Sequence, residues 1–141
     1  MRVLIVGCGR VGGLLAGNLS GEGHDVSVVD GDSRSFRRLP ERFPGRVVLG
    51  TGIDEDVLRT AGVEQADVFV AVTHDDNTNI MAAQIARKVF HIDRVVLRIY
   101  DQARADVYRQ LGLMVICPTT TVAGMIEDEV LRSSAAGVRL P

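Results

Sequence analysis

Six short apolar runs, rich in Val and Ile, are spaced along the whole chain and predict six β-strands. They occupy Val3–Val6, Val26–Val29, Arg46–Leu49, Val68–Val72, Arg94–Leu97 and Met114–Ile116. The fourth run, "VFVAV", is apolar at every position, without the alternation of a half-exposed strand. A strand covered on both faces has this pattern, which is typical of parallel sheets.

Segments with helical periodicity separate the apolar runs. In the first of them, one stripe is formed by Val11, Leu14, Leu15, Asn18 and Leu19, and glycines 21 and 23 end the pattern. Further helices are predicted over Ser33–Arg42 (with Phe36 and Leu39 pointing inward), Asp54–Ala61, Asn77–Phe90 and Ala103–Leu111. This alternation predicts an α/β fold: a Rossmann-like, doubly wound parallel sheet of six strands. Right-handed crossovers favour the strand order 3-2-1-4-5-6.

A sixth helical segment, "TTTVAGMIEDEVLR", follows Pro118 and has no later strand to return to. Its apolar stripe consists of Val122, Met125, Ile126 and Val130. Two interpretations are open: the helix packs on its own sheet, or it projects and buries the stripe against another subunit. We assign residues 1–132 to one domain that includes this helix, at about 119–132, and residues 133–141 to a linker or tail.

The loop between the first strand and the first helix has the spacing G-x-G-x-x-G. Gly7 permits a sharp turn, Gly9 lets a phosphate approach the backbone, and Gly12 lets the helix pack tightly on the sheet. Free N–H groups at the helix start add a positive dipole end. The loop of Gly7, Cys8, Gly9, Arg10, Val11 and Gly12 therefore suits a phosphate group.

Asp30 ends the second predicted strand and stands 18 residues after Gly12, near the spacing of about 20 in dinucleotide-binding folds. A carboxylate there accepts hydrogen bonds from both hydroxyls of an adenosine ribose and repels the 2′-phosphate of NADP. One of the arginines that follow can soften this repulsion. The alternative role for Asp30, a cap on the next helix, suits Asp32 better. Loop and carboxylate together predict nucleotide binding.

The composition and the absence of certain sequence motifs exclude several classes of function. A net charge of −2 leaves no basic surface for nucleic acid, and no apolar stretch reaches the roughly 20 residues of a membrane span. We therefore expect a cytoplasmic protein that does not insert into the membrane. The cysteines and histidines lack metal-ligand spacing, so no metal site is predicted. Catalytic pairs such as Tyr-x-x-x-Lys are missing, which favours a nucleotide sensor. The alternative is the cofactor domain of an NAD-dependent oxidoreductase that lacks its catalytic domain.

Several motifs, taken in order, resemble the nucleotide-binding lobe of TrkA-type potassium-uptake regulators (TrkA-N), called RCK in potassium channels. They are "GCGRVG", "VVD" with Asp32, "GTGIDEDVLRTAGVEQADVFVAVTHDDNTNIMAA", "RIYD" and "LGLMVICPT". The most specific are the arginine in the glycine loop, "DEDVLRxAGVExAD", and T-x-D-D-x-x-N after the fourth strand. The resemblance covers the chain from Met1 to the helix after Pro118.

This resemblance implies a non-enzymatic regulatory subunit that binds NAD(H), ATP, ADP or AMP and gates a potassium channel or uptake system. It implies a homodimer, and further an octameric ring, held at the inner face of the cell membrane by a potassium translocator. The implied ligand set is the glycine loop and Asp30, with Gly31, Asp32, Thr51, Gly52 and Ile53 near the adenine side and Thr73 and Arg98 near the ribose-phosphate. Arg10 would reach a terminal phosphate.

The sequence departs from the family pattern at two places. Many relatives have "GDA" after the third strand, whereas Thr51 stands here in place of the aspartate, which predicts looser adenine selectivity. Thr119 follows Pro118 where some relatives hold a divalent cation with an acidic residue, so the resemblance adds no metal. The family also favours the projecting sixth helix, and usually continues into a second lobe. A nucleotide-gated module of another transporter remains an alternative.

Overall fold

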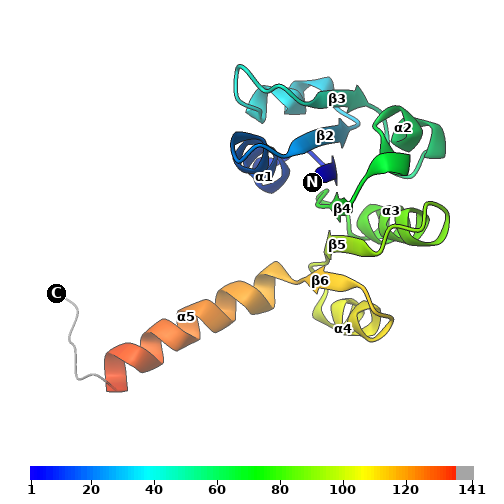
Figure 1. The fold of residues 1–141 in the computed structure, drawn as a ribbon. Helices are drawn as coiled ribbons and strands as arrows, with labels where there is room; N and C mark the ends of the chain where they lie inside the picture. Colours follow the sequence, from blue (N-terminus) through cyan, green and yellow to red (C-terminus); the bar gives the residue numbers. More distant parts are fainter. Residues whose placement is uncertain (136–141) are drawn as a thin grey trace.

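All six strands pair in parallel in one sheet, in the order β3-β2-β1-β4-β5-β6, which confirms the predicted topology. The computed structural model describes residues 1–135. Its elements (Figure 1) are β1 (Arg2–Val6), α1 (Arg10–Gly21), β2 (Asp25–Asp30), the 3-10 helix η1 (Ser33–Arg38), β3 (Arg46–Leu49), α2 (Glu55–Thr60), η2 (Val63–Gln65), β4 (Val68–Ala71), α3 (Asp76–Lys88), β5 (Arg94–Arg98), α4 (Gln102–Gln110), β6 (Met114–Ile116) and α5 (Pro118–Ala135).

The core lies on both faces of this sheet. Helix α1 and η1 cover one face, and α2, α3 and α4 cover the other (Figure 1). Successive residues of a strand point to opposite faces, so Leu4 and Val6 pack with α2 and α3, whereas Val3 and Ile5 pack toward α1. This two-sided burial explains why β4 is apolar at every position.

The predicted apolar stripe of α1 is only partly right about which side faces the sheet: Leu15 and Leu19 pack on the core, but two other members of the stripe do not. Val11 and Leu14 are 49% and 66% exposed, whereas Gly12, Gly13 and Ala16 are buried. A Cβ on Gly12 would collide with the carbonyl of Gly7, so the helix backbone itself lies against the turn. A search for hydrophobic periodicity gives most weight to large apolar side chains. It therefore misses the part of the contact between α1 and the sheet that is made by small residues.

The second predicted helix, Ser33–Arg42, is shorter than expected and is a 3-10 helix that ends at Arg38. Leu39 is already extended, with φ −75° and ψ 151°, because the residue before a proline is disfavoured in the helical region and Pro40 follows. Phe36 and Leu39 do pack on the core, as predicted. Asp32 accepts a hydrogen bond from the Arg34 N–H and so caps this helix.

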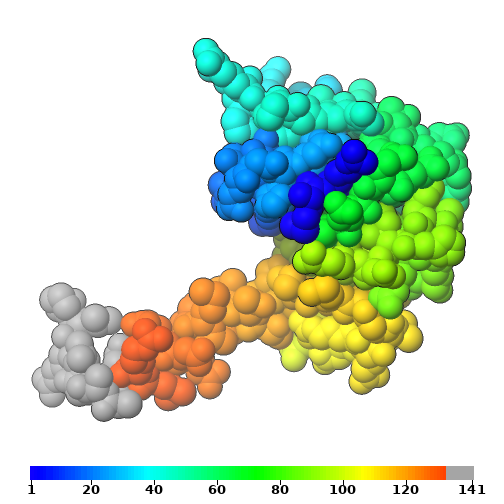
Figure 2. Space-filling model, viewed as in Figure 1, coloured from blue at the N-terminus to red at the C-terminus, as the bar shows by residue number. Residues whose placement is uncertain are grey.

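Helix α5 leaves the sheet directly after β6 and extends away from the domain, as Figures 1 and 2 show. It begins at Pro118 and runs to Ala135, beyond the expected end at residue 132. The rest of the predicted tail, 136–141, lies outside the described residues. The stripe of Val122, Met125, Ile126 and Val130 is exposed along the helix. Within residues 1–135, no helix has the length and apolarity needed to span a membrane.

The burial pattern of α1 predicts effects of different size for two nearby substitutions. Ala16→Leu forces extra volume into a fully buried position and should lower the free energy of unfolding by about 1–3 kcal/mol. Leu14→Ala removes an exposed side chain and should change it by less than about 0.5 kcal/mol. Urea unfolding followed by circular dichroism measures both, and a large loss for Leu14→Ala would contradict this packing.

Candidate nucleotide-binding site

A cleft of about 790 Å³ lies at the carboxyl ends of the central strands. The chain runs from β1 to β2 on one side and returns to β4 on the other, so the segments that follow these strands diverge and leave a crevice. The cleft is lined by residues from the turns after β1, β2, β3, β4 and β5. Ligands of open α/β sheets bind at such a switch point.

The glycine loop forms the floor of the cleft. Gly7 has a left-handed φ of +107°, and a Cβ there would lie 2.8 Å from the backbone nitrogen of Thr73. Gly9 faces open space, since a Cβ built on it meets nothing within 4 Å. It is also the N-cap of α1 and supplies no side-chain cap. The first N–H groups of α1 therefore stay available to an anion.

Asp30 stands beside this loop and is fixed by two backbone amides. Its Oδ2 accepts a hydrogen bond from the Cys8 N–H at 2.8 Å, and its Oδ1 accepts one from the Asp32 N–H at 2.8 Å. Each carboxylate oxygen can accept a second hydrogen bond. The carboxylate is thus held in one orientation while keeping acceptor capacity for a pair of hydroxyl groups.

The neighbouring charged groups are arranged around Asp32. The Arg34 guanidinium donates to both oxygens of Asp32, at 3.1 and 2.9 Å, and these hydrogen bonds hold the pKa of Asp32 below its usual range. Arg34 is therefore engaged at the surface, and Arg38 is the arginine of this segment that lines the cleft.

The pKa of the Cys8 thiol is raised, mainly by burial and to a smaller extent by the negative charge of Asp30. A raised pKa is typical of an unreactive buried cysteine.

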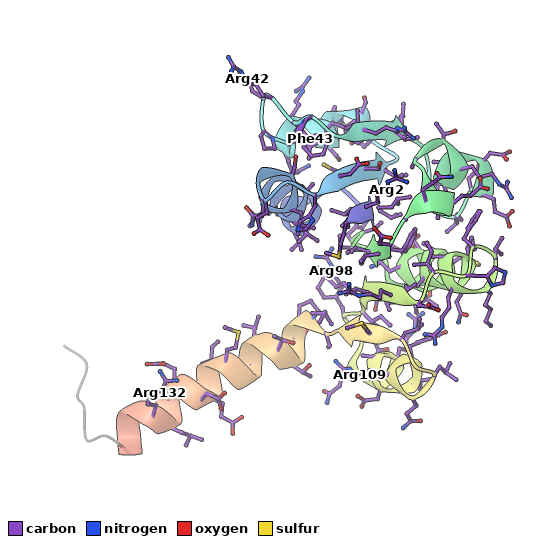
Figure 3. All side chains as sticks on the ribbon, viewed as in Figure 1. Arg2, Arg42, Phe43, Arg98, Arg109 and Arg132 are labelled. Atoms are coloured by element: carbon purple, nitrogen blue, oxygen red, sulfur yellow. The ribbon has the colours of Figure 1, made fainter. Side chains whose placement is uncertain are left out.

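The opposite wall of the cleft comes from the ends of β4 and β5. Arg98, the last residue of β5 (Figure 3), donates from Nη2 to the carbonyls of Val72 and Thr73, both at 2.8 Å. The Tyr100 ring centre lies 5.0 Å from its guanidinium carbon. The Nε of Arg98 is buried and has no hydrogen-bond partner among the described residues. This wall thus contains a cation whose buried Nε donor is unsatisfied.

The structure brings together all but three of the predicted site residues. Cys8 contributes its backbone N–H to Asp30, Gly12 packs under Gly7, and Ile53 is 43% exposed beside the cleft. Sequence reasoning did not place Ser35, Arg38, His74, Asp75, Thr78 and Tyr100 in the site, although they line the cleft. For His74, Asp75 and Tyr100, their position shortly after a strand end was the available signal. Within residues 1–135, no three His, Cys, Asp or Glu side chains gather as a metal site would need.

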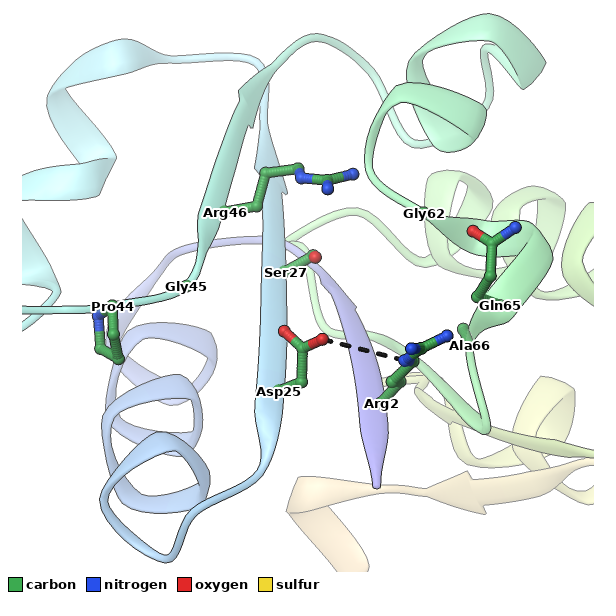
Figure 4. A pocket seen from close by; sticks show the side chains of 9 residues that line it. All are labelled: Arg2, Asp25, Ser27, Pro44, Gly45, Arg46, Gly62, Gln65 and Ala66. Carbon is green, nitrogen blue, oxygen red and sulfur yellow. Dashed lines mark ion pairs between the residues drawn. The ribbon is translucent and has the colours of Figure 1, made fainter.

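A second hollow, of about 530 Å³, lies at the opposite edge of the sheet (Figure 4). Arg2, Asp25 and Arg46, the first residues of β1, β2 and β3, stand around it. Its charged side chains contact one another or the backbone: Arg2 pairs with Asp25 at 3.9 Å, and Arg46 donates to the Thr60 carbonyl at 2.8 Å. The carboxyl-end cleft is therefore the candidate site.

Comparison with known proteins finds a matching family model and similar proteins. The TrkA-N domain family model matches residues 3–118. The chain is 48% identical over 132 residues to the "Trk system potassium uptake protein TrkA" of Streptomyces coelicolor, which covers 94% of this chain but only 57% of that protein. The chain therefore spans less than two thirds of that relative's length.

Two solved structures share the fold. The Shewanella denitrificans Kef C-terminal domain in its AMP-bound form has a TM-score of 0.77 and 24% identity, over 94% of this chain and 80% of that one. The GsuK channel bound to NAD has a TM-score of 0.69 and 22% identity, over 87% of this chain and 22% of that one. At these identities the likeness concerns the fold.

The floor of the cleft predicts a contrast between two glycines. Gly9→Ala meets no atom and keeps an extended backbone, so we expect unfolding within about 0.5 kcal/mol of wild type but weaker binding of ADP, because the new methyl group occupies the phosphate approach. Gly12→Ala collides with the Gly7 carbonyl and should destabilise the fold by more than about 3 kcal/mol. Thermal unfolding and calorimetric titration with ADP measure both effects. Unimpaired ADP binding by Gly9→Ala would refute the assigned floor.

Proposed function

Since this chain belongs to the TrkA-N domain family, we propose that it is a regulatory lobe that binds adenine nucleotides and controls a potassium uptake system. The observation that carries the proposal is the pairing of an oriented Asp30 carboxylate with the uncapped N-terminus of α1 in one cleft. A ribose diol and a phosphate are the groups that need those two partners at once. The relative from Streptomyces coelicolor is named for potassium uptake, and structural neighbours are named with bound AMP and NAD.

In this proposal each wall of the cleft holds one part of the nucleotide. Asp30 accepts from the ribose hydroxyls, and the Gly9 backbone with the α1 N–H groups holds the phosphates. Arg10, exposed at the first position of α1, reaches a terminal phosphate, for which a planar guanidinium is suited. The unpaired Nε of Arg98 supports a ligand on the other wall, because an acceptor there would recover the free energy lost by a buried, unsatisfied donor.

We also propose that the bound nucleotide is held without being converted. Asp75, the acidic side chain nearest the β4 end of the cleft, accepts from the Asn77 N–H and the Thr78 hydroxyl as the N-cap of α3. The Thr78 hydrogen bond lowers the pKa of Asp75, so this carboxylate is ionised and engaged at neutral pH. A group in that state serves structure better than proton transfer. Binding energy then biases a conformation instead of a reaction.

We propose a subunit assembly from the exposed surface of α5 and a membrane partner from the name of the relative. Its exposed apolar stripe supports burial against a second copy, so we propose a homodimer, which in the full regulator is part of a ring. The dimer would sit on the cytoplasmic side of the membrane, held there by the potassium translocator or channel that it regulates.

The Thr51 side chain, in place of an aspartate, leaves the adenine pocket tolerant of several nucleotides.

Calorimetric titration with ATP, ADP, AMP, NAD⁺ and NADH tests the nucleotide proposal. The wild-type chain should bind these ligands and leave NADH unoxidised. Arg10→Ala should weaken ATP about tenfold and AMP much less, because only ATP offers the terminal phosphate. Arg42→Ala, which removes the same charge from a loop away from the cleft (Figure 3), is the matched control. Equal losses for ATP and AMP would remove the role of Arg10, and turnover of NADH would favour the oxidoreductase alternative.

Mass determination in solution tests the role of α5. Replacing both Met125 and Ile126 by glutamate should convert the dimer into a monomer, because it places charge in the apolar stripe. The leucine pair Met125→Leu and Ile126→Leu keeps the stripe apolar and should stay dimeric. Both variants should melt like wild type if α5 adds little to the fold of the lobe. A dimer that survives the two glutamates places the subunit contact elsewhere.

A further inference from the structure

Asn79 is the only buried polar or charged side chain among the residues that the structure describes, and its exposed fraction is zero. It lies in the first turn of α3, behind the cleft wall. Its Oδ1 accepts from the N–H of Thr73 at 2.9 Å and from the Thr73 hydroxyl at 2.6 Å. Its Nδ2 donates to the carbonyls of Thr73 and Arg98, both at 3.0 Å. The amide thus uses all of its donors and acceptors on two residues.

Both residues held in this way line the cleft, and Asn79 itself does not. Thr73 follows β4 and Arg98 ends β5, so a single side chain fixes the ends of two adjacent strands relative to each other. The link is reinforced because the Arg98 guanidinium returns to the same Thr73 carbonyl that Asn79 binds. A shift of Asn79 would therefore move the whole β4–β5 wall.

The strand order says which part of a ligand this wall would meet. β1 and its glycine loop lie between β2, which carries Asp30, and β4, which leads to Thr73. A mononucleotide whose ribose is held by Asp30 and whose phosphates lie over Gly9 is satisfied by the β2 side of the cleft. A dinucleotide has a second nucleoside beyond its phosphates, and the β4–β5 wall is the lining left for it.

We propose that Asn79 is a positioning residue that sets the β4–β5 wall for the distal half of a dinucleotide and so favours NAD(H) over AMP. This inference rests on the proposed nucleotide-binding function and names the part of it that one buried amide controls. Asn79 acts through Thr73 and Arg98 and does not contact the ligand. An aspartate cannot replace it, because the Thr73 and Arg98 carbonyls would each lose the hydrogen bond from the Asn79 amide and a charge would be buried.

A second side chain of the same helix turn extends this wall. Asp76 accepts from the N–H groups of Tyr100 and Asp101, at 2.9 and 3.2 Å, and so holds the loop after β5 that places Tyr100 beside Arg98. The motif T-x-D-D-x-x-N, residues 73–79, is thereby accounted for: its threonine lines the cleft, Asp75 caps α3, and Asp76 and Asn79 hold the wall.

The test compares the affinities of NADH and AMP in matched variants of the full chain. Asn79→Ala should raise the Kd of NADH about tenfold, which corresponds to the loss of roughly one hydrogen bond between the β4–β5 wall and the ligand. The Kd of AMP should change less than about twofold. Ile80→Ala, at the next and also buried position of α3, lowers stability without touching the wall, and should leave the NADH-to-AMP ratio unchanged. Amide hydrogen exchange should become faster at the Thr73 N–H in Asn79→Ala and not in Ile80→Ala.

If Asn79→Ala does not fold, Asn79→Ser removes the same two amide donors with a smaller loss of volume and is measured in its place. An unchanged NADH-to-AMP ratio in either folded variant overturns the inference, as does an equal change in Ile80→Ala. A wild-type chain that binds AMP but not NADH overturns this inference alone. One that binds neither overturns the proposed function, and this inference with it.

Discussion

The contact between Gly12 and the Gly7 carbonyl is the constraint on which the cleft depends. It brings the backbone of α1 against the turn that ends β1, with no side chain between them. The open end of α1 consequently lies beside the ends of β2 and β4, the strands on either side of β1. A bulkier residue at position 12 would push the helix outward and separate its N–H groups from both Asp30 and Thr73. Tight packing and the accessibility of the α1 N–H groups are therefore consequences of the same small residues.

Asp30 links the two halves of this arrangement, because its carboxylate is a structural acceptor before any ligand arrives. By binding the amides of Cys8 and Asp32, it ties the glycine loop to the segment that starts η1. Pre-oriented groups lose little entropy when a ligand binds. In the proposed regulatory role, the free energy of binding is then available to shift one conformation over another.

The sequence predicted the sheet, the order of its strands and most of the cleft. These features depend on local patterns: apolar runs, a glycine spacing and a carboxylate at a strand end. The prediction was partly right about the buried side of α1, because Gly12, Leu15 and Leu19 pack as predicted, but it did not include the burial of Gly13 and Ala16 or the exposure of Val11 and Leu14. It also missed the early end of η1, although Pro40 was a visible signal. The motif T-x-D-D-x-x-N marked Asn79 but did not reveal its role, since its partners Thr73 and Arg98 are 6 and 19 residues away and meet it only through tertiary structure.

Helix α5 begins directly after Cys117, close to the loop that follows β5. The Ile99 N–H donates to the Ile116 carbonyl at 3.0 Å, and the Cys117 thiol lies 3.6 Å from the Tyr100 carbonyl. At 1.5 Å per residue, its 18 residues form a rod of roughly 27 Å. A tilt of about 10° at the root would sweep the far end through about 5 Å, by the geometry of a rod of that length. Any tilt of this helix would therefore be magnified at its far end, and its start adjoins the loop after β5 that carries Tyr100.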